Sequence, residues 1–148
     1  MGKAEILKSI KENKPDLLPL PEIDVTNFIE NINLLAAFKE KVVGVGGSVI
    51  DLSSKSEIDG SLRLKYPNAA KIIDCSQETS LGSVLISEIK EPHKLEDVDL
   101  AIIKGEFGVA ENGAVWISET QFPIRVLPFI ANDLVIVLDK TAICQHLH

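Results

Sequence analysis

Three short aliphatic runs, bounded by charged residues, are the feature of this sequence that most limits its fold. They are Lys71–Asp74, Asp99–Lys104 and Asp133–Leu138. Runs of this length and composition are typical of parallel strands that are buried on both faces between layers of helices. Ile, Leu and Val together make up 47 of the 148 residues, which suits burial of that kind.

Segments with helical spacing of apolar residues alternate with these runs. Four helices are predicted: Lys3–Asn13, Val25–Glu40 with Asp24 as N-cap, Ser54–Lys65, and a helix that begins at Thr141. A further strand is predicted over Lys41–Val45, and the pair Asn112-Gly113 between two apolar stretches predicts a β-hairpin. The alternation predicts an α/β fold with layers, a mostly parallel central sheet, flanking helices and one β-hairpin.

The length is that of one domain with an N-terminal extension. Residues 1–23 are predicted to form a helix and a linker that contains Pro15, Pro19 and Pro21. Residues 24–148 are predicted to form the α/β domain.

Composition excludes several classes of function. The net charge of −7 argues against general electrostatic binding of nucleic acid or of an anionic membrane. Cys75 and Cys144 are too few for a disulfide scaffold, a thiolate zinc site or an iron–sulfur cluster. His93, His146 and His148 lack a third ligand at helical spacing, so no metal site is expected. The chain start lacks the apolar region of a signal peptide, and no stretch is long enough to span a membrane, so we expect a cytoplasmic protein.

The segment Gly105–Trp116 combines glycines, two acidic residues and a tight turn, and is the first candidate for chemistry. Glu111 lies at that turn, where a carboxylate could act as a base or as a nucleophile toward an acyl group. The alternative is that Glu111 is a solvated residue of an ordinary hairpin turn.

Two cationic side chains are further candidates. Arg125 could hold a carboxylate or phosphate, or it could pair with Glu119 or Glu106 as a structural bridge. Lys104, at the end of a predicted strand, has the same two interpretations. The glycines of Gly44–Gly47 predict a plain turn, because Val49 stands where a dinucleotide-binding motif would need its third glycine.

Four motifs in order resemble the LUD domain family, the family of lactate utilisation protein C (LutC/YkgG-like). They are Asp99-Leu-Ala-Ile-Ile, Gly108-Val-Ala-Glu-Asn-Gly-Ala-Val, Arg125-Val-Leu-Pro128 and Asp133-Leu-Val-Ile-Val-Leu. The resemblance covers residues 97–138 and is loose before them. Asn112 and Ala114 stand where the family usually has hydroxyl residues, so hydroxyl contacts to an anion are lost here. The family also continues into a closing strand that we expect this domain to lack.

The resemblance implies a fold like that of the NagB/RpiA/CoA-transferase group. It implies a function as an accessory subunit in the oxidation of L-lactate to pyruvate, together with iron–sulfur and other lactate-utilisation subunits. This chain would bind no cofactor, since any iron–sulfur cluster would be held by a partner. Its ligand would be a small carboxylate, and self-association into a homo-oligomer is a further expectation. The residues assigned to ligand binding are Lys104, Gly108, Asn112, Gly113 and Arg125.

The alternative implied function is that of an enzyme acting on acyl groups and CoA. Ala110-Glu-Asn-Gly113 resembles the turn on which class I CoA transferases carry the glutamate that forms an acyl-CoA thioester. In that case Glu111 would be the nucleophile and the glycine-rich turns would hold phosphates.

Overall fold

The computed structural model describes residues 2–15, 18–24, 26, 31–89, 91–121 and 124–147. The chain divides into two units, Met1–Glu30 and Asn31–His148, and each is described by itself. In the first unit, the predicted N-terminal helix forms as α1 (Lys3–Glu12), and none of its residues is buried. Among the described residues, no helix has the length and apolar character needed to cross a membrane.

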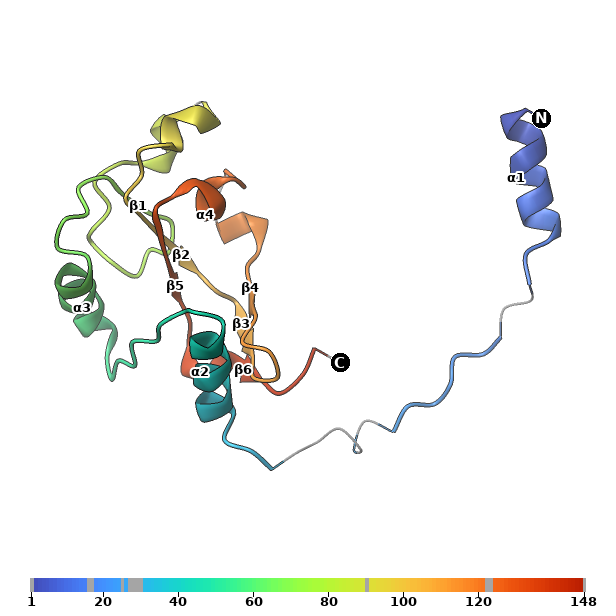
Figure 1. The fold of residues 1–148 in the computed structure, drawn as a ribbon, viewed down its shortest axis with the longest axis horizontal. Helices are drawn as coiled ribbons and strands as arrows, with labels where there is room; N and C mark the ends of the chain where they lie inside the picture. The colour runs from blue at the N-terminus through green and yellow to red at the C-terminus, as the bar shows by residue number, and fades with distance from the viewer. Residues whose placement is uncertain are drawn as a thin grey trace. The chain divides into compact units, whose positions relative to one another are not determined.

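A parallel three-stranded sheet forms the centre of the second unit. Its strands are β1 (Ile72–Asp74), β2 (Leu100–Lys104) and β5 (Asp133–Val137), in the order β1-β2-β5 (Figure 1). All three strands were predicted from the aliphatic runs, and the parallel arrangement is confirmed. Only β2 is buried along most of its length; β5 lies at an edge of the sheet, and its first two residues are exposed.

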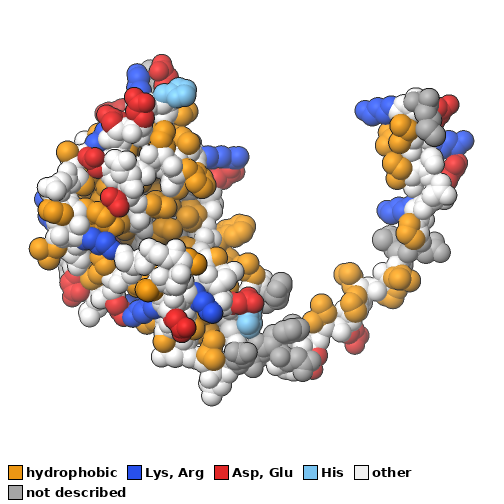
Figure 2. Space-filling view, in the orientation of Figure 1, with side chains coloured by type: hydrophobic (Ala, Val, Ile, Leu, Met, Phe, Trp, Pro, Cys, Tyr) orange, Lys and Arg blue, Asp and Glu red, His pale blue; other side chains and the backbone are white. Residues whose placement is uncertain are grey.

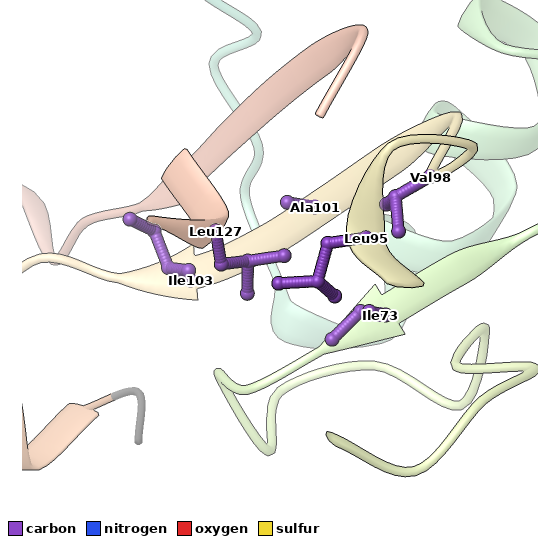
Figure 3. Packing of buried hydrophobic residues seen from close by; sticks show 6 residues of the cluster. All are labelled: Ile73, Leu95, Val98, Ala101, Ile103 and Leu127. Carbon is purple, nitrogen blue, oxygen red and sulfur yellow. The ribbon is translucent and has the colours of Figure 1, made fainter. Parts of the chain in front are cut away.

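Both faces of this sheet are covered, as two-sided burial predicts. Side chains alternate between the faces along each strand. On one face Ile73, Ala101 and Ile103 pack with Leu95, Val98 and Leu127, and all six side chains are fully buried (Figure 3). Leu127 belongs to α4 (Leu127–Ile130). On the other face α3 (Ile58–Lys65) buries Ile58 and Leu62 against β2.

A second sheet contains the predicted hairpin. Its order is β4-β3-β6, where β3 is Phe107–Val109, β4 is Val115–Trp116 and β6 is Ile143–Cys144. β3 pairs antiparallel with β4 and parallel with β6. The hairpin is confirmed, and residues 110–114 connect its two strands. A helix, α2 (Leu34–Gly44), covers this sheet, with Phe38 packed among Ala110 and Ile143.

The predictions for residues 24–45 are partly wrong. The helix begins after Asn33, whose Oδ1 accepts a hydrogen bond from the Ala36 N–H at 3.1 Å. Asp24 instead accepts hydrogen bonds from Thr26, and residues 25 and 27–30 lie outside the described residues. The predicted strand Lys41–Val45 is part of α2, because Val42 lies one helical turn after Phe38 and packs in the same core. Tertiary packing outweighs the strand preference of valine here.

The glycine-rich turn forms as predicted, whereas the C-terminal segment differs from its prediction. Gly46, at φ +89°, follows the end of α2, so the glycine-rich segment is a turn after a helix. The predicted helix from Thr141 is wrong. A single 3₁₀ turn, η6 (Lys140–Ala142), is followed by β6, whose Cys144 carbonyl accepts a hydrogen bond from Ala110 N–H at 2.9 Å. Pairing with β3 gives the backbone N–H and C=O groups of this segment hydrogen-bond partners, so that a helix is not needed to provide them.

Candidate functional site

A bulge forms where the parallel sheet passes into the second sheet. β2 continues into β3 and β5 into β6, and both pairs are parallel. Lys104 pairs with Val137, whereas Gly108 pairs with Ile143, so the β5–β6 side carries two more residues across the junction. The longer segment, residues 138–142, accommodates the two extra residues, and we call it the bulge. It follows β5 directly, so Asp139 lies at the carboxyl edge of the parallel sheet.

The loop that follows β1 is held in a fixed shape by its own polar groups. Asp74 accepts hydrogen bonds from Ser76 N–H at 2.8 Å and from the Thr79 hydroxyl at 2.8 Å. Ser76 is buried, and its Oγ accepts a hydrogen bond from the Glu78 N–H at 3.1 Å. Gln77 between them has φ +59°, a left-handed conformation that costs free energy for a residue with a side chain. The loop is thereby shaped so that Glu78 reaches the end of β2.

Glu78 is held between two lysines. Its Oε1 lies 2.9 Å from Nζ of Lys104, at the end of β2, and its Oε2 lies 2.7 Å from Nζ of Lys55. The Glu78 side chain is 11% exposed, whereas that of Lys55 is 74% exposed. The hydrogen bonds from Lys55 and then from Lys104 lower the pKa of Glu78 below its ordinary value. The carboxylate is therefore ionised at neutral pH, and both ammonium groups face solvent beside it.

Two further carboxylates, Asp139 and Asp51, lie in the segment after β5 or pair with it. Asp139 Oδ1 accepts hydrogen bonds from Thr141 N–H at 2.8 Å and from its hydroxyl at 2.7 Å. These two hydrogen bonds, together with the charges of Lys55 and Lys104, lower the pKa of Asp139. Asp51 pairs with both Lys140 and Lys39, which lower its pKa to about 2.

We name these seven side chains the carboxyl-edge cluster: Lys39, Asp51, Lys55, Glu78, Lys104, Asp139 and Lys140. They come from α2, from the segment before α3, from the β1 loop, from the end of β2 and from the bulge after β5. Figure 2 shows basic and acidic side chains interspersed on one face of this unit. Ligands of open α/β sheets bind outside the carboxyl ends of the strands, which is where this cluster lies.

Of the cluster, the sequence analysis identified Lys104 alone. The other members were missed because only the order of the strands brings their loops together. One signal was available: Glu78 and Asp139 each follow shortly after an aliphatic run. Polar residues at that position of neighbouring parallel strands meet at one edge of the sheet.

Glu111, the predicted catalytic residue, lies in the hairpin loop and is exposed. Its Oε2 is 3.5 Å from Nδ1 of His146, and its N–H donates to the Gln145 carbonyl at 3.1 Å. The hairpin loop is thus tied to the segment after β6. His146 was considered from the sequence only when a metal site was rejected, and this contact was not predicted.

Arg125 does not join Glu111. Its guanidinium pairs with Glu119, which was one of the two structural partners considered, and both side chains are exposed. The hairpin loop precedes β4, whereas Glu119 lies in the 3₁₀ turn that follows β4, so the two groups lie toward opposite ends of that strand. The functional roles predicted for Glu111 and for Arg125 stay predictions.

The three remaining predicted ligand-binding residues are accounted for by local packing. A Cβ on Gly108 would lie 2.9 Å from side-chain atoms of Phe38 and of Leu138. Gly113 has φ +74° and packs against the backbone of α2. The Asn112 side chain accepts a hydrogen bond from Ala114 N–H at 2.9 Å. These contacts shape the hairpin; whether a ligand also uses these residues stays a prediction.

Two other features of the described residues bear on ligands. No three His, Cys, Asp or Glu side chains in this part of the chain gather in the way a metal ion would require. A groove of about 380 Å³ lies at the opposite, amino end of the parallel strands, between α3 and β1, and its lining includes Arg63, Tyr66 and Ser83. Ser83 is already bonded to the backbone there, as acceptor from Ile72 N–H and donor to the Ala70 carbonyl.

Comparison with known proteins gives a match at the level of structure. No protein-family model matches the sequence, and no curated protein matches it. The fold matches the crystal structure of a DUF162 family protein from Deinococcus radiodurans with a TM-score of 0.67 and 16% sequence identity. The match covers 85% of this chain and 77% of that chain. DUF162 is the LUD family, so the chain has the fold of a LUD protein, as the resemblance in its sequence predicts.

Proposed function

We propose that this protein is a LUD-type accessory subunit that binds a small carboxylate of the lactate class at the carboxyl-edge cluster. Electron transfer in the oxidation of L-lactate to pyruvate would then take place in partner subunits that carry iron–sulfur clusters. The observation that carries the proposal is the convergence of Lys55 and Lys104 on Glu78 at the carboxyl edge of a parallel sheet.

The two lysines can bind a ligand carboxylate and keep their hydrogen bonds to Glu78. An ammonium group has three N–H donors. Lys55 and Lys104 each use one of them on Glu78. The side chains of Lys55 and Lys104 are 74% and 46% exposed, so their remaining donors are accessible from solvent. An incoming carboxylate would complete the hydrogen bonding of both ammonium groups.

Electron transfer is assigned to partner subunits because of the cysteine content of this chain. Two cysteines cannot supply the four thiolates of an iron–sulfur cluster. The purified chain, mixed with L-lactate and an artificial electron acceptor, should therefore reduce no acceptor, whereas addition of the iron–sulfur partner should restore the reaction. Reduction by the chain alone would contradict the accessory role.

Thermal shift measurements with L-lactate, pyruvate and CoA test the binding site. A ligand at one hundred times its dissociation constant stabilises the folded state by about 2.7 kcal/mol. L-lactate should raise the melting temperature of the wild type, and Lys104→Met should remove most of that shift. Lys94→Met is the matched control, since it removes the same charge from an exposed side chain of η4 (Pro92–Leu95).

A shift with CoA alone would favour the alternative enzyme. Glu111→Gln would then be expected to retain CoA binding and to block thioester formation, because the amide cannot act as the nucleophile. No shift with any of the three compounds would overturn the proposed binding site.

A further inference from the structure

We propose that the free edge of β5 is a dimerisation surface, on which β5 of a second copy of this chain pairs antiparallel. β5 is the last strand of the order β1-β2-β5, so pairing there would join two three-stranded sheets into one continuous sheet across a two-fold axis. The inference does not depend on the proposed ligand site, because it concerns the side of a strand and not the carboxyl ends of the strands.

The backbone groups of β5 face two directions in alternation. The N–H of Asp133 and the carbonyl of Val137 are both bonded to the residues that flank β2, so these alternate residues face β2. The N–H and C=O groups of Leu134 and Ile136 therefore face away from β2. Within the described part of the chain, no hydrogen bond reaches these outward groups. They are free to pair with another strand.

The opposite edge of the same sheet, at β1, is covered by the loop that follows β1. The Ile72 carbonyl accepts hydrogen bonds from the N–H groups of Ser83 at 2.9 Å and Val84 at 3.2 Å. The Ile72 N–H donates to Ser83 Oγ at 2.8 Å, and Gly82 packs against Asp74. Among the described residues of this sheet, the open edge is that of β5. Pairing through one edge closes at a dimer, whereas two open edges would allow continued growth.

The sequence of β5 is suited to pairing with itself. Between Asp133 and Asp139 the chain carries only aliphatic side chains, without the lysine or proline that protects many exposed edges. An antiparallel pair centred on Val135 sets Leu134 opposite Ile136 of the partner subunit, so the outward backbone groups of the two residues bond each other. A pair centred on Ile136 would instead set Asp133 opposite Asp139 of the partner subunit, and like charges disfavour that register.

Leu134 adds an apolar contact to the backbone pairing. Its side chain is 37% exposed and lies on the same face of the sheet as that of Ile136, which packs in the cluster of Leu127. In the proposed pair Leu134 would contact Ile136 of the partner subunit across the two strands. The exposed leucine would then be covered by the second copy.

Sedimentation velocity tests the association on the full chain. Over about a hundredfold range of concentration, the wild type should show a monomer–dimer equilibrium. Leu134→Lys should remain monomeric over that range, because both copies would place a charge against an aliphatic side chain at the edge. Leu85→Lys is the matched control, since Leu85 is exposed beside the covered edge at β1, and it should retain the dimer. Circular dichroism should show that both variants are folded.

A disulfide tests the register. Val135 would lie opposite Val135 of the partner subunit in a non-hydrogen-bonded pair, where the Cα atoms are about 4.5 Å apart and a disulfide can form. Mild oxidation of Val135→Cys should therefore link two copies at position 135, as identified by peptide mass spectrometry. Ile136→Cys should form no such link at position 136, because Ile136 would lie opposite Leu134.

The outcomes decide the proposal in either direction. A wild type that stays monomeric at every concentration would overturn it. A dimer that persists in Leu134→Lys and gives no link at position 135 would place the interface elsewhere. Species that grow beyond the dimer would contradict pairing through one open edge. If Leu134→Lys does not fold, the presence or absence of the link in Val135→Cys decides.

Discussion

Nζ of Lys104 lies 2.9 Å from Oε1 of Glu78, so the end of β2 is tied to the loop that follows β1. The two residues are 26 positions apart in the chain, and parallel pairing of their strands brings them together. The contact lies at the carboxyl edge, beside the bulge that carries Asp139. One ion pair therefore connects the fold of the sheet to the proposed ligand site.

Replacing Glu78 with glutamine should destabilise the protein modestly. The variant leaves Lys55 and Lys104 near each other without their shared counter-charge. Because the site is open to solvent, we expect a loss of about 1 kcal/mol in the free energy of unfolding, measured by urea denaturation. Glu88→Gln, on an exposed 3₁₀ turn, should change the value by less than about 0.5 kcal/mol. Equal effects of the two variants would contradict a structural role for Glu78.

The ion pairs of Asp51 should make the stability of the folded protein depend on pH in the acid range. Lys140 and Lys39 lower its pKa from 3.8 to about 2, so the folded state favours its ionised form. Its contribution is present above about pH 4 and is lost as the pH falls toward 2. Asp51→Asn should therefore flatten the melting temperature profile between pH 4 and pH 2. High salt should weaken the same dependence in the wild type, because the ion pairs are exposed. Parallel profiles for wild type and variant would contradict this assignment.

The sheet could be predicted from the sequence because its strands are marked locally. Lys71–Asp74, Asp99–Lys104 and Asp133–Leu138 are aliphatic apart from charged residues at their ends, and burial between two layers requires such composition. The strand predicted at Lys41–Val45 failed for a different reason. Its valines favour strands, but Phe38 and Val42 share a helical face that packs on the second sheet. The residues of the segment Lys41–Val45 alone do not indicate that Val42 packs on the second sheet.

The candidate site was less predictable than the fold. Lys104 could be identified from its place at the end of an aliphatic run. Glu78 and Asp139 follow aliphatic runs, but Glu78 lies in a segment without periodicity, and the loop of Asp139 is shaped by the register of two strand pairs. The structure pairs Glu111 with His146 and Arg125 with Glu119, and only the second of these contacts was considered from the sequence.

Three glycine substitutions should distinguish the effect of backbone strain on the free energy of unfolding from the effect of overpacking. Gly113→Ala should cost about 1 kcal/mol or more, since φ is +74° and the new Cβ would lie 3.0 Å from the Val42 nitrogen. Gly108→Ala should cost about 1–3 kcal/mol through overpacking against Phe38. Gly60→Ala is the control in α3, where no atom lies within 4 Å, and it should stabilise the protein by about 0.5–1 kcal/mol. Chemical denaturation measures all three, and a stabilising Gly113→Ala would contradict the described hairpin.

Cys75 should react slowly with alkylating reagents in the folded protein. Burial at the end of β1, and then the charge of Asp74, raise its pKa from 9.0 to about 11. Since the thiolate is the reactive form, the rate of modification by iodoacetamide at pH 8 should be about a hundredfold lower in the folded chain than in urea. Peptide mass spectrometry resolves this rate from that of Cys144. Asp74→Asn should speed the reaction of the folded protein, because it removes the charge that opposes ionisation. A folded rate equal to that in urea would show that the thiol is not buried at the end of β1, and would thereby contradict the packing of the loop that positions Glu78.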